Sequence, residues 1–90
     1  MTAYSITYDL KTPGRDYNGL YEAIKASGKW WHYLDSTWIV ITNETSQQIW
    51  ERLEKSVDKN DFVLIIEVKR NSFGWLPKDA WDWINTNVPA

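Results

Sequence analysis

A block of nine residues, from Trp30 to Trp38, concentrates the side chains best suited to binding chemistry. It holds three of the seven tryptophans, the only histidine, and the adjacent hydroxyls of Ser36 and Thr37. Flat rings beside small hydroxyls suit a nucleobase and its phosphate, because bases stack on aromatic faces and hydroxyls bond phosphate oxygens. Aromatic residues are equally typical of an interface between subunits. The block itself leaves both interpretations open.

The side chains of this block divide between two surfaces if residues 30–34 form a strand. Alternation places Trp30 and His32 on one face, and Trp31 and Tyr33 on the other. One face must cover the helices, so only part of the aromatic set can stack a base, a contact of roughly 1–3 kcal/mol. No serine or cysteine nucleophile motif adjoins His32, which favours a structural or binding role over general-base catalysis.

Two further groups could hold a phosphate. The loop from Lys11 to Arg15 offers two cations, a hydroxyl and free backbone amides ahead of a predicted helix. Ser36 and Thr37 could bond phosphate oxygens from the turn between two strands. Each group has an equally simple structural interpretation, as a solvated loop and as a turn whose hydroxyls bond their own backbone.

Asp9 is the one candidate for metal chemistry. It stands at the end of the first predicted strand, where a carboxylate could hold Mg²⁺ and orient water for phosphodiester cleavage. The alternative is a turn residue that accepts hydrogen bonds from the loop amides. A metal site usually needs a second carboxylate, and the options are Glu67, the only other acidic residue in a predicted strand, or Asp9 of a second copy.

Composition limits the class of protein. Ninety residues make one domain with a small core, so self-association is a reasonable expectation. Ten basic and 12 acidic residues give a net charge of −2, which argues against long nucleic acid as the partner. The absence of cysteine excludes disulfides and thiolate metal sites. The longest apolar run, Phe62 to Ile66, is far too short to cross a membrane, so we expect a cytoplasmic protein.

The hydrophobic pattern predicts an α+β domain spanning residues 1–90. Strands are expected at residues 4–10, 30–34, 37–42 and 62–68, the last of them central because its apolar run is nearly continuous. One helix precedes Gly28, placed where a glycine would end it, and another follows a capping box of Thr45 and Gln48. The order is βαββαβ, a ferredoxin-like arrangement with a four-stranded antiparallel sheet over about residues 3–69.

An extra C-terminal helix is predicted within about residues 75–88. Trp81 and Ile84 share one of its faces and Trp83 lies on another. The four-stranded core does not need this helix, so we interpret it as a lid on an open sheet face or an arm on a neighbouring subunit. Trp75 and the tryptophans of the helix could close an aromatic lid over a ligand, or pack across a subunit interface.

Several short motifs resemble a known family. They are Tyr8-Asp9-Leu10, Pro13-Gly14, Tyr17, Trp30-Trp31-His32 and Ser36-Thr37-Trp38. Over about residues 4–68 the chain resembles the SinR-like proteins and the small CRISPR-associated ferredoxin-fold endoribonucleases, with their VapD-like relatives. The resemblance implies a ferredoxin-like fold, a homodimer or larger assembly and, for the nuclease branch, Asp9 as metal-binding residue. The chain departs from that branch in its charge, since RNA and DNA favour a basic surface.

We therefore expect a non-catalytic nucleotide-binding protein, a homodimer or homotetramer that sequesters a cyclic dinucleotide or similar signalling nucleotide without a cofactor. The comparison is with phage anti-defence sponges, and it rests on size and composition. The residues expected to bind the ligand are Tyr8, Lys11, Arg15, Trp30, Trp31, His32, Ser36, Thr37, Trp38 and Trp75. One alternative is a metal-dependent endoribonuclease in which Asp9 holds Mg²⁺ or Mn²⁺. The other is a structural or regulatory interaction protein without a small ligand.

Overall fold

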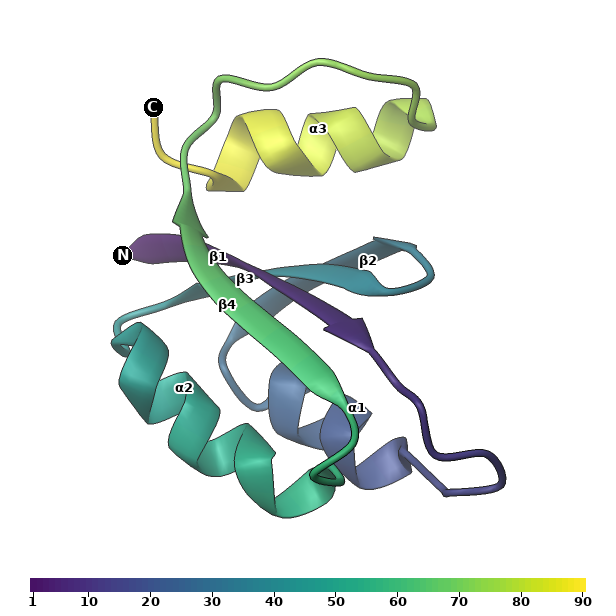
Figure 1. Cartoon of the computed structure of the whole chain (residues 1–90). Helices are drawn as coiled ribbons and strands as arrows, with labels where there is room; N and C mark the ends of the chain where they lie inside the picture. The colour runs from purple at the N-terminus through teal and green to yellow at the C-terminus, as the bar shows by residue number, and fades with distance from the viewer.

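The computed structural model describes residues 1–90 and arranges them in three layers (Figure 1). The middle layer is a four-stranded antiparallel sheet with the strand order β2-β3-β1-β4. The elements in chain order are β1 (Thr2–Asp9), α1 (Asn18–Lys25), β2 (Lys29–Leu34), β3 (Thr37–Thr42), α2 (Ser46–Leu53), the 3₁₀ helix η1 (Glu54–Ser56), β4 (Phe62–Val68) and α3 (Lys78–Asn87). The predicted α+β class, with a four-stranded antiparallel sheet, is confirmed.

Both faces of the sheet carry helices. Tyr4 and Ile6 on β1 are buried on the face that α1 and α2 cover, which we call the α1–α2 face. Ala3 and Ser5 alternate with them and lie on the opposite face, which α3 covers in part and which we call the α3 face. Because side chains alternate between the two faces of β1, this strand contributes to two separate hydrophobic cores.

The helix α2 begins at the predicted capping box. The Gln48 amide donates to Thr45 Oγ1 at 3.1 Å, and the Thr45 amide donates to Gln48 Oε1 at 2.8 Å. Ile49 and Leu53, one turn apart, are fully buried against the α1–α2 face. Trp50 is 38% exposed beside β4, although its position three residues before Leu53 suggests a place in the core.

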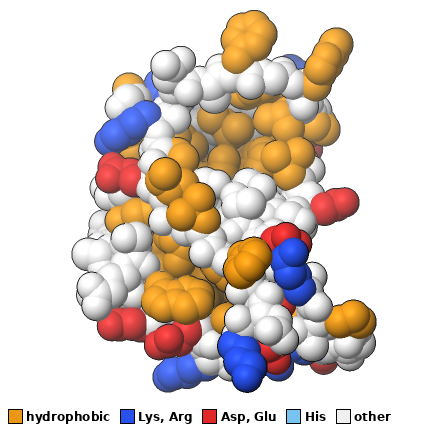
Figure 2. Space-filling view, in the orientation of Figure 1, with side chains coloured by type: hydrophobic (Ala, Val, Ile, Leu, Met, Phe, Trp, Pro, Cys, Tyr) orange, Lys and Arg blue, Asp and Glu red, His pale blue; other side chains and the backbone are white.

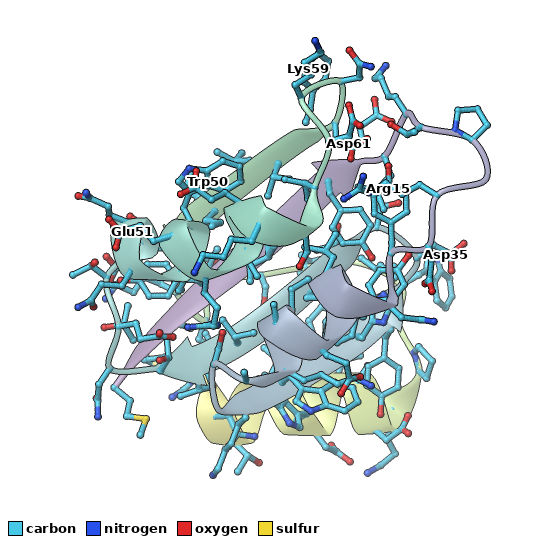
Figure 3. The ribbon with its side chains drawn as sticks, turned by 90° about the horizontal axis from the view of Figure 1, so that it is seen from below. Arg15, Asp35, Trp50, Glu51, Lys59 and Asp61 are labelled. Carbon is cyan, nitrogen blue, oxygen red and sulfur yellow. The ribbon has the colours of Figure 1, made fainter.

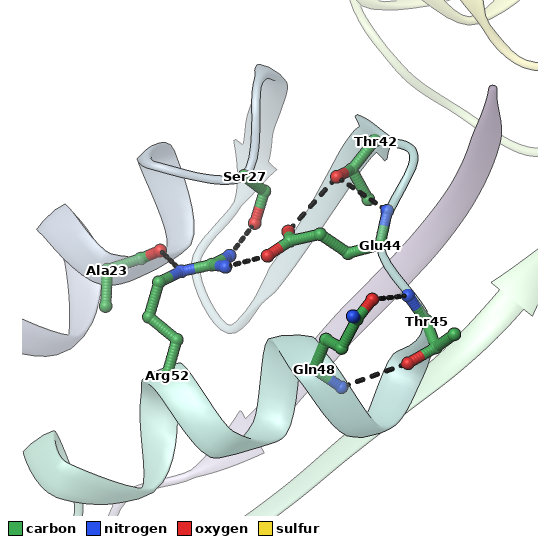
Figure 4. Close-up of polar contacts among 7 residues, drawn as sticks. All are labelled: Ala23, Ser27, Thr42, Glu44, Thr45, Gln48 and Arg52. Atoms are coloured by element: carbon green, nitrogen blue, oxygen red, sulfur yellow. Dashed lines mark hydrogen bonds and ion pairs between the residues drawn. The ribbon is translucent and has the colours of Figure 1, made fainter.

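One arginine joins α2 to its neighbours (Figure 4). Arg52 Nε donates to the Ala23 carbonyl at the end of α1 at 2.9 Å. Its two terminal nitrogens bond the Glu44 carboxylate and the Ser27 hydroxyl. Glu44 in turn accepts a hydrogen bond from Thr42 Oγ1 at 3.1 Å. Arg52 thus ties both helices and the loop before α2 into one network.

A second, smaller core lies between the sheet and α3. Ala80, Ile84 and Val88 recur every four residues along the helix and are buried on the α3 face. Trp31 is buried beneath them, and its Nε1 donates to the Ala80 carbonyl at 3.2 Å. The structure therefore places α3 over the sheet of its own chain.

The position of β4 differs from the prediction. It lies at an edge of the sheet and pairs only with β1. Val63 and Ile65 are half-buried on the α1–α2 face, whereas Phe62, Leu64 and Ile66 are exposed on the other. Its apolar run reflects one uncovered apolar face, and not the burial on both faces that a central strand has.

Gly28 also has a different role from the predicted one. α1 ends at Lys25 with Ala26 as a right-handed cap, so Gly28 does not terminate the helix. Its φ is +143°, and a Cβ there would lie 2.6 Å from the Ile41 carbonyl oxygen. Glycine is required because the chain must approach β3 closely as β2 begins. None of the three helices combines the length and apolar character needed to cross a membrane.

Candidate functional site

Part of the aromatic block forms a cluster on the α1–α2 face. The His32 ring stacks on Trp38 with centroids 3.7 Å apart, and Trp30 packs against the same ring. Trp38 is buried, and its Nε1 donates to the Tyr8 hydroxyl at 3.0 Å. That hydroxyl donates to the Asp35 carbonyl at 3.2 Å, and burial raises the pKa of Tyr8 above its ordinary value.

This packing removes most of the predicted stacking surfaces. Trp38 and Tyr8 build the core, and Trp31 is covered by α3 on the other face. Trp30 is 43% exposed, and the Lys25 ammonium lies 5.0 Å from its ring centroid. Among the aromatic residues of the block that were predicted to bind a ligand, only Trp30 and the half-buried His32 face solvent.

The predicted hydroxyls sit at the turn between β2 and β3. The Ser36 carbonyl accepts a hydrogen bond from the Tyr8 amide at 3.1 Å, which holds the turn to the end of β1. Thr37 Oγ1 lies 3.4 Å from Thr7 Oγ1 on the α3 face. The two hydroxyls therefore belong to a turn and to the first residue of β3.

The loop from Lys11 to Arg15 is organised around a carboxylate. Asp61 accepts hydrogen bonds from the Lys11 amide and the Tyr17 hydroxyl, each at 2.8 Å. Partial desolvation opposes the effect, but these bonds, a third from the Asp58 amide and the nearby Arg15 charge lower the pKa of Asp61. Figure 3 shows Arg15 beside Asp61.

The charges and hydroxyl of this loop are directed toward the protein. Arg15 pairs with Asp58 at 3.8 Å and Lys11 with Asp9 at 3.2 Å. The Thr12 hydroxyl is buried without a hydrogen-bond partner, so it does not face solvent. The loop thus surrounds an internal anion and does not offer the predicted cradle to an external phosphate.

Asp9 and Glu67, the second carboxylate that the sequence offered, lie far apart on the sheet. Asp9 is exposed at the end of β1 opposite Phe62, while Glu67 pairs with Tyr4 near the other end and on the other face. No group of three or more histidine, aspartate or glutamate side chains is placed to hold a metal ion. The chain therefore does not pair Asp9 with Glu67.

A hollow on the α3 side brings together groups that could bind a ligand, which the predicted ligand residues do not. It lies between α3 and the segment that joins β4 to it, residues 69–77, which we call the connecting segment. Its volume is about 420 Å³, within the range of small-molecule sites. The lining residues are Arg70, Ser72, Phe73, Gly74, Trp81 and Asn85. We call it the Arg70 hollow, and Figure 2 shows the surface hollowed beneath the connecting segment, with hydrophobic side chains around it.

Arg70 is fixed at its base and free at its tip. Its Nε donates to the Val88 carbonyl at 2.9 Å, and its backbone amide donates to the Pro89 carbonyl at 2.8 Å. Arg15 and Arg52 each pair with a carboxylate, whereas Arg70 pairs with none. Its two terminal nitrogens keep their donors, in the fork that binds a phosphate through two parallel hydrogen bonds.

Aromatic side chains border the same hollow. Phe73 is fully exposed on the connecting segment, and Trp81 is half-buried on α3. Trp81 and Asn85, four residues apart, lie on the same side of the helix. The Arg70 hollow therefore combines a free cation, two aromatic rings and amide and hydroxyl groups in one place.

A smaller apolar hollow adjoins the first. Its volume is about 240 Å³, and Ser72 lines both. Its floor includes Trp31 and Ile39 from the sheet and Ile84 from α3. Trp31 and Thr37 are the only predicted ligand residues that border either hollow. Trp75 projects fully into solvent from the connecting segment and lines neither.

The sequence contained one local signal for the Arg70 hollow. Residues 70–74 combine an arginine, a hydroxyl and an aromatic residue outside any periodic pattern, as is typical of a connecting loop. No sequence pattern marks Asn85 as a lining residue, because its place in the hollow depends on how α3 is rotated over the sheet. No protein-family model matches the chain, and no solved structure matches it.

Proposed function

We propose that the chain is a non-catalytic nucleotide-binding protein and that its ligand occupies the Arg70 hollow. The observation that carries the proposal is Arg70 itself, an anchored guanidinium without a carboxylate partner beside an exposed aromatic ring. A phosphate would pair with the terminal nitrogens of Arg70, and a base would stack on Phe73 or Trp81. Ser72 and Asn85 would bond the polar edge of the base or the sugar.

The absence of proton-transfer groups from the hollow supports binding without turnover. Its six lining residues include no carboxylate, histidine or lysine. The Ser72 hydroxyl donates to the Arg70 carbonyl at 2.8 Å and has no base beside it. General acid–base chemistry near neutral pH needs a side chain such as histidine or a carboxylate that can exchange a proton, and the lining of the hollow offers none.

We also propose the ferredoxin-like class for the fold and an oligomer for the assembly. The succession βαββαβ and the strand order β2-β3-β1-β4 support the first, with α3 as an addition on the opposite face. The second is supported by the exposed apolar residues of β4 and the connecting segment. The same residues favour a second candidate function, that of an interaction protein.

Calorimetric titration with AMP, GMP, cyclic di-AMP and cyclic di-GMP tests the ligand proposal. We expect heat of binding with at least one of them at micromolar protein concentration. Arg70→Gln should weaken that binding about 10- to 100-fold, because hydrogen bonds to charged groups contribute about 1.5–3 kcal/mol. Phe73→Ala should weaken it by a similar factor through lost stacking.

The matched control is Arg15→Gln, which removes the same charge from an arginine paired with Asp58 outside the hollow. It should leave the affinity unchanged. The proposal fails if none of the four nucleotides binds, or if Arg15→Gln weakens binding as much as Arg70→Gln.

A further inference from the structure

The apolar row on β4 has no cover in the single chain. Phe62, Leu64 and Ile66 are 65%, 58% and 51% exposed, and they follow one another on the α3 face. Hydrophobic side chains are exposed over this part of the surface in Figure 2. Neither α3 nor the connecting segment reaches this end of the sheet, so the row remains open to solvent.

The free edge of β4 is also unprotected. The strand runs seven residues without proline and without a register shift against β1. The other edge strand, β2, begins with Lys29 and shifts register between Trp31 and Leu34. Proteins commonly blunt edges with lysines, prolines or bulges, and a long apolar edge that lacks them is a template for another strand.

The surface beside β4 is apolar on the helix side too. Trp50 of α2 lines a hollow of about 330 Å³ with Val63 and Ile65 of β4. Figure 3 shows Trp50 next to this strand. Both sides of this edge therefore leave apolar surface exposed, and a strand added there would be flanked by it.

We propose that β4 pairs with β4 of a second copy, antiparallel and about a two-fold axis at Ile65. Ile65 is the midpoint of Phe62–Val68, so this register is the only symmetric one that pairs all seven residues. Leu64 then faces Ile66 of the second copy, and Phe62 faces Val68. The two sheets join into one of eight strands. This interface specifies the proposed oligomer and does not depend on the nucleotide site.

The apolar row itself favours a second copy. With the axis at Ile65, Leu64 and Ile66 of each copy meet Ile66 and Leu64 of the other, so the exposed apolar side chains of the two rows cover one another. An exposed apolar row that matches itself about a two-fold axis therefore identifies a second copy as the partner of this edge.

Sedimentation velocity measures the predicted dimer. The wild-type chain should sediment as a dimer, and Leu64→Lys or Ile66→Lys should shift it to monomer, because a lysine would face an apolar side chain of the second copy. Leu34→Lys is the control, since Leu34 is a comparably exposed leucine on β2, at the opposite edge of the sheet. Circular dichroism identifies any variant that fails to fold.

Cysteine cross-linking tests the register. The chain has no cysteine, and directly opposed Cα atoms in antiparallel strands lie about 4.5–5.5 Å apart, within disulfide range. Ile65→Cys should therefore form a covalent dimer on mild oxidation, and Leu64→Cys should not. A monomeric wild type overturns the oligomer as well as this interface. A dimer that survives Ile66→Lys, or that cross-links through Leu64→Cys alone, overturns only this interface.

Discussion

Replacing Arg52 with methionine should lower the free energy of unfolding by about 2–3 kcal/mol. Methionine keeps the apolar stem but removes every donor from a side chain that bonds Glu44, Ser27 and the Ala23 carbonyl (Figure 4). The side chains of Arg52 and Glu44 are 27% and 29% exposed, so the pair is mostly sheltered from water. The loss of stability on breaking this pair should therefore exceed that on breaking a surface ion pair.

The magnitude follows from two limits. An exposed ion pair contributes about 0–1 kcal/mol, and breaking a fully buried pair costs about 3–5 kcal/mol. A pair that is roughly three-quarters covered falls between them, and the loss is softened because Glu44 keeps its hydrogen bond from Thr42. In a domain of this size 1 kcal/mol shifts the melting temperature by about 4–8 °C, so we expect a fall of about 10–20 °C.

Urea unfolding followed by tryptophan fluorescence measures the effect. Lys78→Met is the matched control: its ion pair with Asp82 is a mostly exposed i,i+4 pair that water screens, so the loss of stability should be much smaller than that of Arg52→Met. A double-mutant cycle with Glu44→Gln should give a coupling energy of about 1 kcal/mol or more. A loss below 1 kcal/mol for Arg52→Met, or one equal to that of Lys78→Met, would refute the argument.

Two further predictions concern the loops. Because the pKa of Asp61 is lower in the folded chain than its ordinary 3.8, its contribution to stability is complete above that value and is lost as pH falls through the folded-state pKa. The difference in urea midpoint between wild type and Asp61→Asn should therefore shrink from pH 6 to pH 2.5, and a constant difference would contradict this. Gly28→Ala should lower stability by about 1–3 kcal/mol through its clash with the Ile41 carbonyl. Gly14→Ala, also at positive φ but in open space, should cost less in the same urea assay, and equal losses would count against the clash.

Local patterns were enough to predict most of the elements. The capping box of Thr45 and Gln48, the alternation of β1 and the hairpin around Ser36 depend on residues close in sequence, and all three are present. The position of β4 was wrong for a physical reason. An apolar run shows that both faces of a strand carry apolar side chains, and it does not say whether both faces are covered.

The candidate site was harder to predict because it is built from tertiary contacts. The aromatic block attracted attention by its density, but Trp38 and Trp31 pack on opposite faces and satisfy their ring nitrogens internally. Arg70 stands in a segment without periodicity, and its significance appears only when the Val88 carbonyl is seen to hold its Nε. Pairing of the other two arginines with carboxylates is likewise invisible in sequence.

The two proposals together constrain how a ligand would bind. Val68, the last residue of β4 before the connecting segment, would face Phe62 of the second copy, six residues from that copy's own Val68. At about 3.3 Å per residue the two connecting segments begin roughly 20 Å apart along the joined strands. Each Arg70 hollow then belongs to a single chain, because its lining comes from the connecting segment and α3 of that chain. We therefore expect one nucleotide per chain without cooperativity, whereas a stoichiometry of one ligand per dimer would require a different interface.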